Sequence, residues 1–335
     1  MIFDYHHHFL PFAIAERKGF RAGQKGNLTE GGIPKLTVHP RLYDLEAQLR
    51  EMDQVGIDVS VLSCNLGWDG TLADCREINE AGAELQRKYP TRFAALAHAP
   101  VLEAEGLAEI ERSVKELGLR GATIASQVNG LCLDAAELRP FYKRMCDLDL
   151  AVFIHPAMLP QGYSMFREYD LARIIGREMD LQIQVARVIA GRVMEEFPSL
   201  KLVFSHFGGG IAAVKERLMG KAGRFGTLTR PFEESFDRLY FDTAGFEGGP
   251  VALRCAVQGI RPDRLVFATD YPQDFTGATS QSGKTVLHIR DYIDEIRRLD
   301  LPQGAADAIL GETAAGLLHI DAATFLRTAP APVGA

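Results

Sequence analysis

Three consecutive histidines at the end of the first predicted strand form the clearest group of residues that could do chemistry. The sequence Met1-Ile-Phe-Asp-Tyr5 runs directly into His6, His7 and His8. In an extended strand successive side chains point to opposite faces, so His6 and His8 share one face and His7 lies on the other. Two neutral imidazoles on one rigid element supply half of a site for zinc or a similar divalent ion. A tag remnant and histidines without a metal are the alternatives, which only the rest of the chain can distinguish.

Further histidines and one aspartate stand where later predicted strands end. Together with the first pair, the residues at strand ends are His6, His8, His155, His206 and Asp270. A lone histidine after a strand is more often structural, but the agreement of five positions argues against chance. Catalytic groups of parallel barrels lie at the carboxyl ends of the strands. The sequence therefore predicts one site built from the ends of strands one, five, six and eight.

Eight short runs of β-branched, aromatic and other apolar residues predict the strands that position these side chains. They are Met1–Tyr5, Asp58–Ser63, Phe93–Ala97, Ala122–Ala125, Ala151–Ile154, Leu202–Ser205, Leu239–Asp242 and Leu265–Thr269. Segments with helical spacing of apolar residues lie between most of them, including Leu45–Val55, Ala104–Leu117 and Ile183–Phe197. This alternation is typical of a parallel sheet covered on both faces, and we expect a (β/α)₈ TIM barrel. An open doubly wound sheet is the alternative, but it predicts a glycine-rich phosphate turn where the three histidines stand.

The predicted barrel occupies residues 1–322 as a single domain. A length of 335 residues also allows two domains, although α/β barrels routinely run this long as one. Residues 10–40 are rich in glycine and lysine and do not fit the strand–helix rhythm. We expect them to form a long loop insertion after strand one, acting as a lid or substrate loop, with a flexible surface insertion as the alternative. Residues 323–335 are expected to form a C-terminal tail.

Composition and charge argue against several classes of function. The chain is 47% hydrophobic and 24% charged, as in an ordinary globular enzyme. A formal net charge of −7 argues against nucleic-acid partners and an anionic membrane surface. We find no apolar run long enough to span a bilayer and no secretion signal. The five cysteines are scattered and never form a CxxC pair, so we expect no disulfide framework and a cytoplasmic location.

The order HxH, His, His, Asp on strands one, five, six and eight resembles the amidohydrolase superfamily of metal-dependent barrels. The resemblance covers residues 1–320. It is strongest in Arg50–Val59, Glu196–Leu202, Ser205–Gly210 and Ala268–Pro272, which look like the branch containing aminocarboxymuconate semialdehyde, γ-resorcylate and carboxyvanillate decarboxylases. It implies a metal-dependent, non-oxidative decarboxylase of a small aromatic or dienoic carboxylic acid. It also implies a homodimer or a larger homo-oligomer.

The same resemblance implies His6, His8, His155 and Asp270 as metal ligands, with room left for water or substrate. Many dinuclear members bridge two metals through a modified lysine or a carboxylate at the end of strand four, and Gly121–Gln127 offers neither. We therefore expect one divalent ion, Zn²⁺, with Mn²⁺ as the alternative because imidazole with carboxylate suits both.

His206 would then be free for acid–base catalysis, and Asp270 could bind the metal and also relay a proton. A role in orienting neighbouring groups is the alternative for His206. The glycines at 208–210 would let the backbone approach the site closely, or simply begin a helix.

Five further residues are candidates for binding an acidic substrate. By resemblance Arg217 corresponds to an arginine that reaches the neighbouring subunit's site, although a surface charge is equally consistent. Lys35 and Arg41 lie near the position of a second family arginine that has no clear counterpart here. Phe207 and Tyr271 could supply an aromatic wall, with core packing as the alternative.

Departures from the semialdehyde decarboxylase leave the reaction open. Ala157 stands where that enzyme has a tryptophan, and Phe207 stands where it has a glycine, so we do not expect the same substrate. A metal-dependent hydrolase of a lactone or amide, or a hydratase, could use the same residues. A catalytically silent barrel that serves as a binding protein is the alternative from another class.

Overall fold

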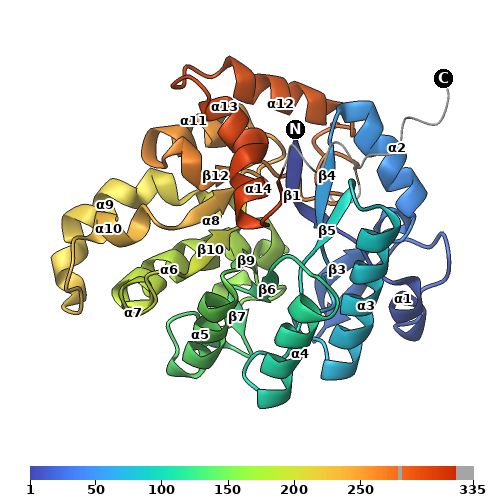
Figure 1. Cartoon of the computed structure of the whole chain (residues 1–335), viewed down its shortest axis with the longest axis horizontal. Helices are drawn as coiled ribbons and strands as arrows, with labels where there is room; N and C mark the ends of the chain where they lie inside the picture. Colours follow the sequence, from blue (N-terminus) through green and yellow to red (C-terminus); the bar gives the residue numbers. More distant parts are fainter. Residues whose placement is uncertain (278–280, 322–335) are drawn as a thin grey trace.

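Eight parallel strands form a closed barrel in the computed structural model, which describes residues 1–277 and 281–321 (Figure 1). They are β1 (Phe3–His8), β4 (Val59–Ser63), β5 (Phe93–Ala95), β6 (Ala122–Ala125), β9 (Ala151–His155), β10 (Lys201–Phe204), β11 (Tyr240–Asp242) and β12 (Leu265–Val266). They pair in the orders β1-β4-β5 and β6-β9-β10-β11-β12. Parallel bridges between Ala97 and Ala122 and between His7 and Tyr271 join the two sheets at both edges. The predicted (β/α)₈ barrel is therefore confirmed.

Helices cover the outside of the barrel. They are α2 (Leu45–Val55), α3 (Leu72–Lys88), α4 (Ala104–Lys115), α5 (Arg139–Leu148), α6 (Arg177–Ala190), α7 (Val193–Glu196), α9 (Lys215–Lys221), α10 (Phe232–Phe236), α11 (Pro250–Gly259), α12 (His288–Arg298), α13 (Ala305–Asp307) and α14 (Thr313–Leu317). The prediction for α2 is confirmed residue by residue, because the Asp44 side chain caps its start and left-handed Gly56 ends it. The single helix predicted at 183–197 is wrong, since Arg192 adopts a left-handed conformation between α6 and α7.

The inside of the barrel is filled by alternate residues of the strands. One buried cluster contains Phe3, Tyr5, Val59, Val61, Ala94, Leu96, Phe153, Val203 and Val266. Residues of α14, among them Ala314 and Leu317, belong to the same cluster and close one end of the barrel. The intervening strand residues pack outward against the helices in a second, larger cluster. The open end of the barrel, where the strands finish, is therefore the place for a catalytic site.

A β-bulge in β1 positions the first two histidines. Phe3 and Asp4 pair with Val59 and Ser60, but His7 pairs with Leu62, so β1 carries one extra residue between Asp4 and His7. Strict alternation from Phe3 and Tyr5 would send His6 outward. Because of the bulge, Tyr5 and His6 both contact the Phe153 ring, at 5.9 and 4.9 Å between centroids. The prediction that His6 and His8 share a face is confirmed, although the strand is not regular.

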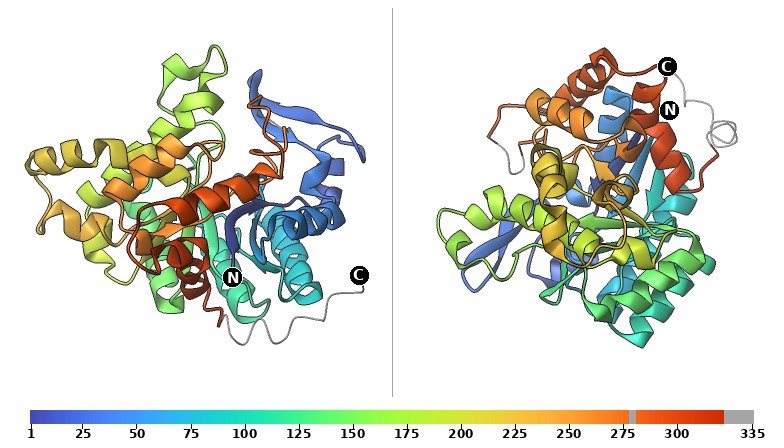
Figure 2. Two further views of the ribbon diagram at one scale, coloured as in Figure 1. Left: turned by 90° about the horizontal axis from the view of Figure 1, so that it is seen from above. Right: turned by 90° about the vertical axis from the view of Figure 1, so that its left-hand side faces the viewer.

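Residues 10–40 are not an irregular loop. They form α1 (Phe12–Arg17) and an antiparallel hairpin of β2 (Gly26–Glu30) and β3 (Ile33–Val38). In the left view of Figure 2 the blue hairpin rises from the end of the barrel opposite the N-terminus. A shorter hairpin, β7 (Gln127–Val128) and β8 (Leu131–Cys132), follows β6. The predicted tail at 323–335 lies outside the described residues, and no described helix is long and apolar enough to cross a membrane.

Candidate metal centre and its cavity

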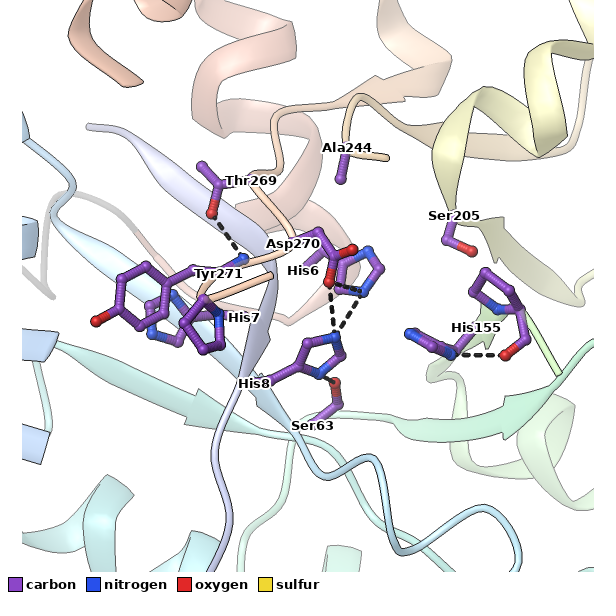
Figure 3. A network of polar contacts seen from close by, with 12 residues as sticks. His6, His7, His8, Ser63, His155, Ser205, Ala244, Thr269, Asp270 and Tyr271 are labelled. Atoms are coloured by element: carbon purple, nitrogen blue, oxygen red, sulfur yellow. Dashed lines mark hydrogen bonds and ion pairs between the residues drawn. The ribbon is translucent and has the colours of Figure 1, made fainter. Parts of the chain in front are cut away.

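Three histidines and one aspartate meet at the open end of the barrel (Figure 3). His6 and His8 end β1, His155 ends β9, and Asp270 follows β12. All four are buried, and one ligand atom from each lies within 4.8 Å of the others. His8 Nε2 is 2.9 Å from Asp270 Oδ1 and 3.1 Å from His6 Nε2. The structure thus brings together the four residues that the sequence predicted as metal ligands.

Each imidazole is held by a partner at its Nδ1 atom. His6 Nδ1 donates to the Asp242 carboxylate at 2.9 Å, and His155 Nδ1 donates to the Pro156 carbonyl at 2.8 Å. His8 Nδ1 lies 3.1 Å from the Ser63 hydroxyl. Carboxylates and carbonyls only accept, so in His6 and His155 the Nε2 lone pair faces the centre. Such partners at the second nitrogen are the usual support of histidine ligands to metals.

The charge states also fit a metal. Burial, together with the nearby His6 and His8, lowers the pKa of His155 well below its ordinary value, and burial lowers the pKa of His8. Burial alone would raise the pKa of Asp270, but the neighbouring His6, His206 and His8 bring it well below its ordinary value. Neutral imidazoles beside an ionised carboxylate are the donors that zinc and manganese accept. The donor set therefore fits one divalent cation, which would also offset repulsion between the converging lone pairs.

Two aromatic side chains stack on histidines of β1 and β9, and the sequence pattern singled out only one of them. Trp68, the single tryptophan, stacks on the His155 ring with centroids 3.7 Å apart, and its Nε1 donates to Thr123 Oγ1 at 2.9 Å. It lies in a connection after β4, where no periodic signal marks it. Tyr271 stacks on His7 at 4.4 Å, on the opposite side of β1 from the centre (Figure 3). His7 therefore packs against Tyr271 and is not one of the four candidate ligands.

His206 lies beside Asp270 and is paired with a glutamate. His206 Nδ1 donates to Glu178 Oε1 at 2.8 Å. Its Nε2 is buried without a hydrogen-bond partner and lies 3.6 Å from Asp270 Oδ2. Burial would lower the pKa of His206, but the charges of Glu178 and Asp270 raise it well above its ordinary value. The imidazole can therefore carry a proton at Nε2, next to the ligand group.

A left-handed turn holds His206 in place. The residues from His206 to Gly210 all have positive φ, between 53° and 78°. A Cβ on Gly209 would lie 1.9 Å from the Glu178 carbonyl oxygen, and one on Gly245 would lie 2.1 Å from the His206 ring. Only glycine fits at these two positions. The glycine run thus permits close approach of the backbone, and it forms a left-handed turn, not an ordinary helix start.

A cavity of about 550 Å³ opens above these residues. His155, His206 and Asp270 form part of its wall, and the hairpin contributes Lys35. The segment that leads into α6 adds Arg173, Arg177 and Glu178. The structure therefore places His155, Asp270 and His206 around one cavity with several cations.

Among the predicted substrate-binding residues, only Lys35 lines this cavity. Arg41 pairs with Glu51 at 3.0 Å, and the Tyr271 hydroxyl contacts the same carboxylate at 2.6 Å. Phe207 is buried against Phe246, with centroids 5.8 Å apart. Its side chain and that of Tyr271 belong to the core, so neither forms a cavity wall. Arg217 is exposed on α9 and does not line the cavity of its own chain.

The sequence pattern missed Arg173 and Arg177. They stand one helical turn apart, immediately before and at the start of α6. The predicted helix began at 183, six residues after α6 begins at Arg177, so these arginines fell in an unassigned stretch. The two arginines are four residues apart with Glu178 beside them, and this helical spacing of charges is the sequence signal that could have identified them.

Comparison with known proteins agrees with this architecture. A family model described as Amidohydrolase matches residues 3–320. The chain is 27% identical over 266 residues to decarboxylase orsB of Emericella nidulans, covering 75% of this chain and 80% of that protein. It is 30% identical over 282 residues to 2-amino-3-carboxymuconate-6-semialdehyde decarboxylase of Dictyostelium discoideum, covering 80% and 77%. The fold is similar to that of 5-carboxyvanillate decarboxylase from Sphingomonas paucimobilis, with a TM-score of 0.79, 24% identity and coverage of 96% and 99%.

Two further similarities bear on the metal and the reaction. A dihydroxybenzoic acid decarboxylase from Polaromonas sp. JS666, with bound manganese, has a TM-score of 0.76 at 24% identity, covering 97% of this chain and 98% of that one. The chain is also 26% identical over 325 residues to 2-keto-4-carboxy-3-hexenedioate hydratase of Sphingobium sp., covering 88% and 90%.

Proposed function

The chain belongs to the amidohydrolase family, and from this premise we propose that it is a metal-dependent, non-oxidative decarboxylase of a small aromatic or dienoic carboxylic acid. The observation that carries the proposal is the buried group of three imidazoles and one carboxylate, of which His155 and Asp270 line a cavity that also contains several cations. The decarboxylases among its relatives support the reaction class.

His6, His8, His155 and Asp270 would hold one divalent ion, Zn²⁺ or, as in the similar Polaromonas structure, Mn²⁺. When bound, the ion would anchor the substrate carboxylate or an adjacent hydroxyl and stabilise developing negative charge. Strand β6, with the sequence Ala-Thr-Ile-Ala, offers no bridging carboxylate or lysine for a second ion.

His206 and Asp270 would deliver the proton that the substrate carbon takes up. Decarboxylation breaks the bond between a substrate carbon and its carboxylate, CO₂ leaves, and the carbon accepts a proton. His206 can hold that proton at Nε2 because Glu178 compensates the imidazolium charge at Nδ1. Asp270 Oδ2, 3.6 Å from Nε2, is placed to relay it.

The hairpin β2–β3 is the lid in this proposal. Lys35 Nζ pairs with Asp69 on the barrel rim at 2.7 Å, and the Lys35 carbonyl accepts from Arg177 Nη2 at 2.7 Å. The hairpin is thus tied down on two sides of the cavity. Amide hydrogen exchange over residues 26–38 should slow when a benzoate ligand binds the metal-loaded protein, whereas unchanged exchange there would argue against a lid.

Hydration is the second candidate, and the hydratase from Sphingobium sp. favours it because that protein aligns with 88% of this chain. A bound, activated water could add to a conjugated acid at the same site. This reaction releases no CO₂, which separates the two candidates.

The test is CO₂ release from a panel of hydroxybenzoates and muconate-like acids, with lactones in parallel. We expect the protein loaded with zinc or manganese to release CO₂ from at least one acid. Removal of the metal by a chelator should abolish this activity. Hydration or lactone hydrolysis without any CO₂ release would overturn the proposal.

A further inference from the structure

Arg177, a buried cation of the cavity wall, has no counter-ion among the described residues. The Arg177 guanidinium donates from Nε and Nη2 to the Met158 carbonyl, at 3.0 and 2.6 Å, and from Nη2 to the Lys35 carbonyl at 2.7 Å. Within residues 1–277 and 281–321, Arg177 forms no ion pair, and Nη1 makes no hydrogen bond. Both N–H groups of Nη1 are therefore available to a ligand in the cavity.

Two other cations of the same wall are already neutralised. Lys35 pairs with Glu30 at 2.6 Å and with Asp69 at 2.7 Å. Arg173 pairs with Asp170 at 2.5 Å. Of these three cations, Arg177 alone keeps its positive charge for a ligand, and Lys25 of the same wall is a further cation.

The environment keeps Arg177 charged and fixed. Burial and the neighbouring Arg173 lower the pKa of Arg177 to about 10, so the side chain remains a cation at neutral pH. Two backbone carbonyls hold the guanidinium plane in one orientation. A buried charge without a partner is costly, and an anionic ligand would remove that cost.

We propose that Arg177 binds a second carboxylate of the substrate, so that the enzyme acts on dicarboxylic acids in preference to monocarboxylic ones. The inference rests on the proposed function, in which the metal centre takes the reacting end of the molecule. An arginine suits the distal carboxylate because guanidinium–carboxylate hydrogen bonds are charge-assisted and directional. The class predicted is a planar or conjugated diacid whose second carboxylate is not lost.

The test measures binding of two unreactive probes, isophthalate and benzoate, to the metal-loaded protein. Titration calorimetry, with quenching of Trp68 as a second readout, would give Kd for each probe. In Arg177→Gln we expect isophthalate to bind about 10- to 100-fold more weakly, and benzoate to change less than about 3-fold. Arg177→Lys keeps the charge and should recover part of the affinity for isophthalate. Arg187→Gln, on the same helix but paired with Asp134 outside the cavity, is the matched control.

Equally weakened binding of both probes in Arg177→Gln would overturn the inference. This is the result expected if Arg177 only joins the Lys35 and Met158 carbonyls and does not bind a carboxylate. Unchanged isophthalate binding would also overturn it. Neither measurement needs turnover. If no acid loses CO₂ but the two probes are still discriminated through Arg177, the proposed function fails and the diacid subsite stands.

Discussion

Each imidazole of the proposed metal centre is fixed through Nδ1, so the residues behind the ligands should control metal affinity. Asp242 fixes two histidines of the site, because it accepts from His6 Nδ1 at 2.9 Å and from the His206 backbone amide at 2.7 Å. Strand ends in the sequence predicted the five candidate residues, and the family resemblance implied which four of them are ligands. Asp242 also ends a strand, β11, but its carboxylate contacts the ligand His6 and is not itself one of the four ligands. This contact is visible only in the folded barrel.

Asp242→Asn should weaken metal binding by about 10- to 100-fold, because the amide no longer provides an ionised acceptor for His6 Nδ1–H. Competition with a chromogenic chelator would measure the dissociation constant. Asp237→Asn, a half-exposed carboxylate one turn before β11, is the control and should bind metal normally. Equal affinity in Asp242→Asn and wild type would contradict the assigned support.

Glu178→Gln should lower kcat by about 100-fold while metal content stays at the wild-type level. Glu178 helps to hold the pKa of His206 above its ordinary value, so in the variant this pKa falls. The protonated fraction at neutral pH then falls as well, and the basic limb of the pH–rate profile should move to lower pH. A profile that keeps its basic limb would show that His206 is not the proton donor.

The elements around the site show which structural features the sequence could and could not predict. The eight strands were predictable because their residues are apolar on both faces, and α2 was predictable from its caps. The bulge in β1 was not, since Tyr5 and His6 both face inward only when β1 pairs with β4. The hairpin at 26–38 was also missed, because glycine and lysine there weaken the alternating pattern of a strand.

A buried glutamate ties two neighbouring helices of the barrel together. Glu109 on α4 accepts from Arg76 and Asn79 of α3 and from Arg112 and Ser113 of its own helix. Burial alone would raise the pKa of Glu109, but the hydrogen bonds from Arg112, Asn79 and Ser113 lower it. Its ionised form therefore stabilises the fold.

Glu109→Gln should lower the free energy of unfolding at pH 7 by about 1–3 kcal/mol. Because the folded pKa of Glu109 is lowered, its contribution is present above the ordinary value of 4.5 and is lost as pH falls through the folded pKa. Urea unfolding at pH 7 and at pH 3–4 would measure this. A difference between wild type and variant that does not shrink in acid would contradict the ionised role.

At the scale of the whole molecule, the sequence predicts that two copies share a site through Arg217. Arg217 is exposed on α9 and is not among the residues that line the cavity of its own chain. The prediction that Arg217 serves a partner's site therefore concerns an assembly of at least two copies. A single sequence predicts the barrel because its pattern repeats along the chain, whereas surfaces between copies carry no such repeat.

Mixing two inactive variants tests this sharing. Arg217→Ala and His206→Asn should each lose most activity, and unfolding and refolding them together should restore about a quarter of wild-type activity, since mixed dimers regain one complete site. Activity that stays at the level of the separate variants would show that Arg217 does not act across subunits. Full activity of Arg217→Ala alone would show the same.

One divalent ion bound by residues from three strands is central to the proposed function, and metal analysis tests it most directly. Protein loaded with zinc or manganese and freed of excess ion would be measured by mass spectrometry, beside His155→Gln and Asp270→Asn with their folding checked by circular dichroism. We predict one ion per wild-type chain and almost none in either folded variant. Two ions per wild-type chain, or a full ion retained in both variants, would contradict the assignment of His6, His8, His155 and Asp270 as the metal site.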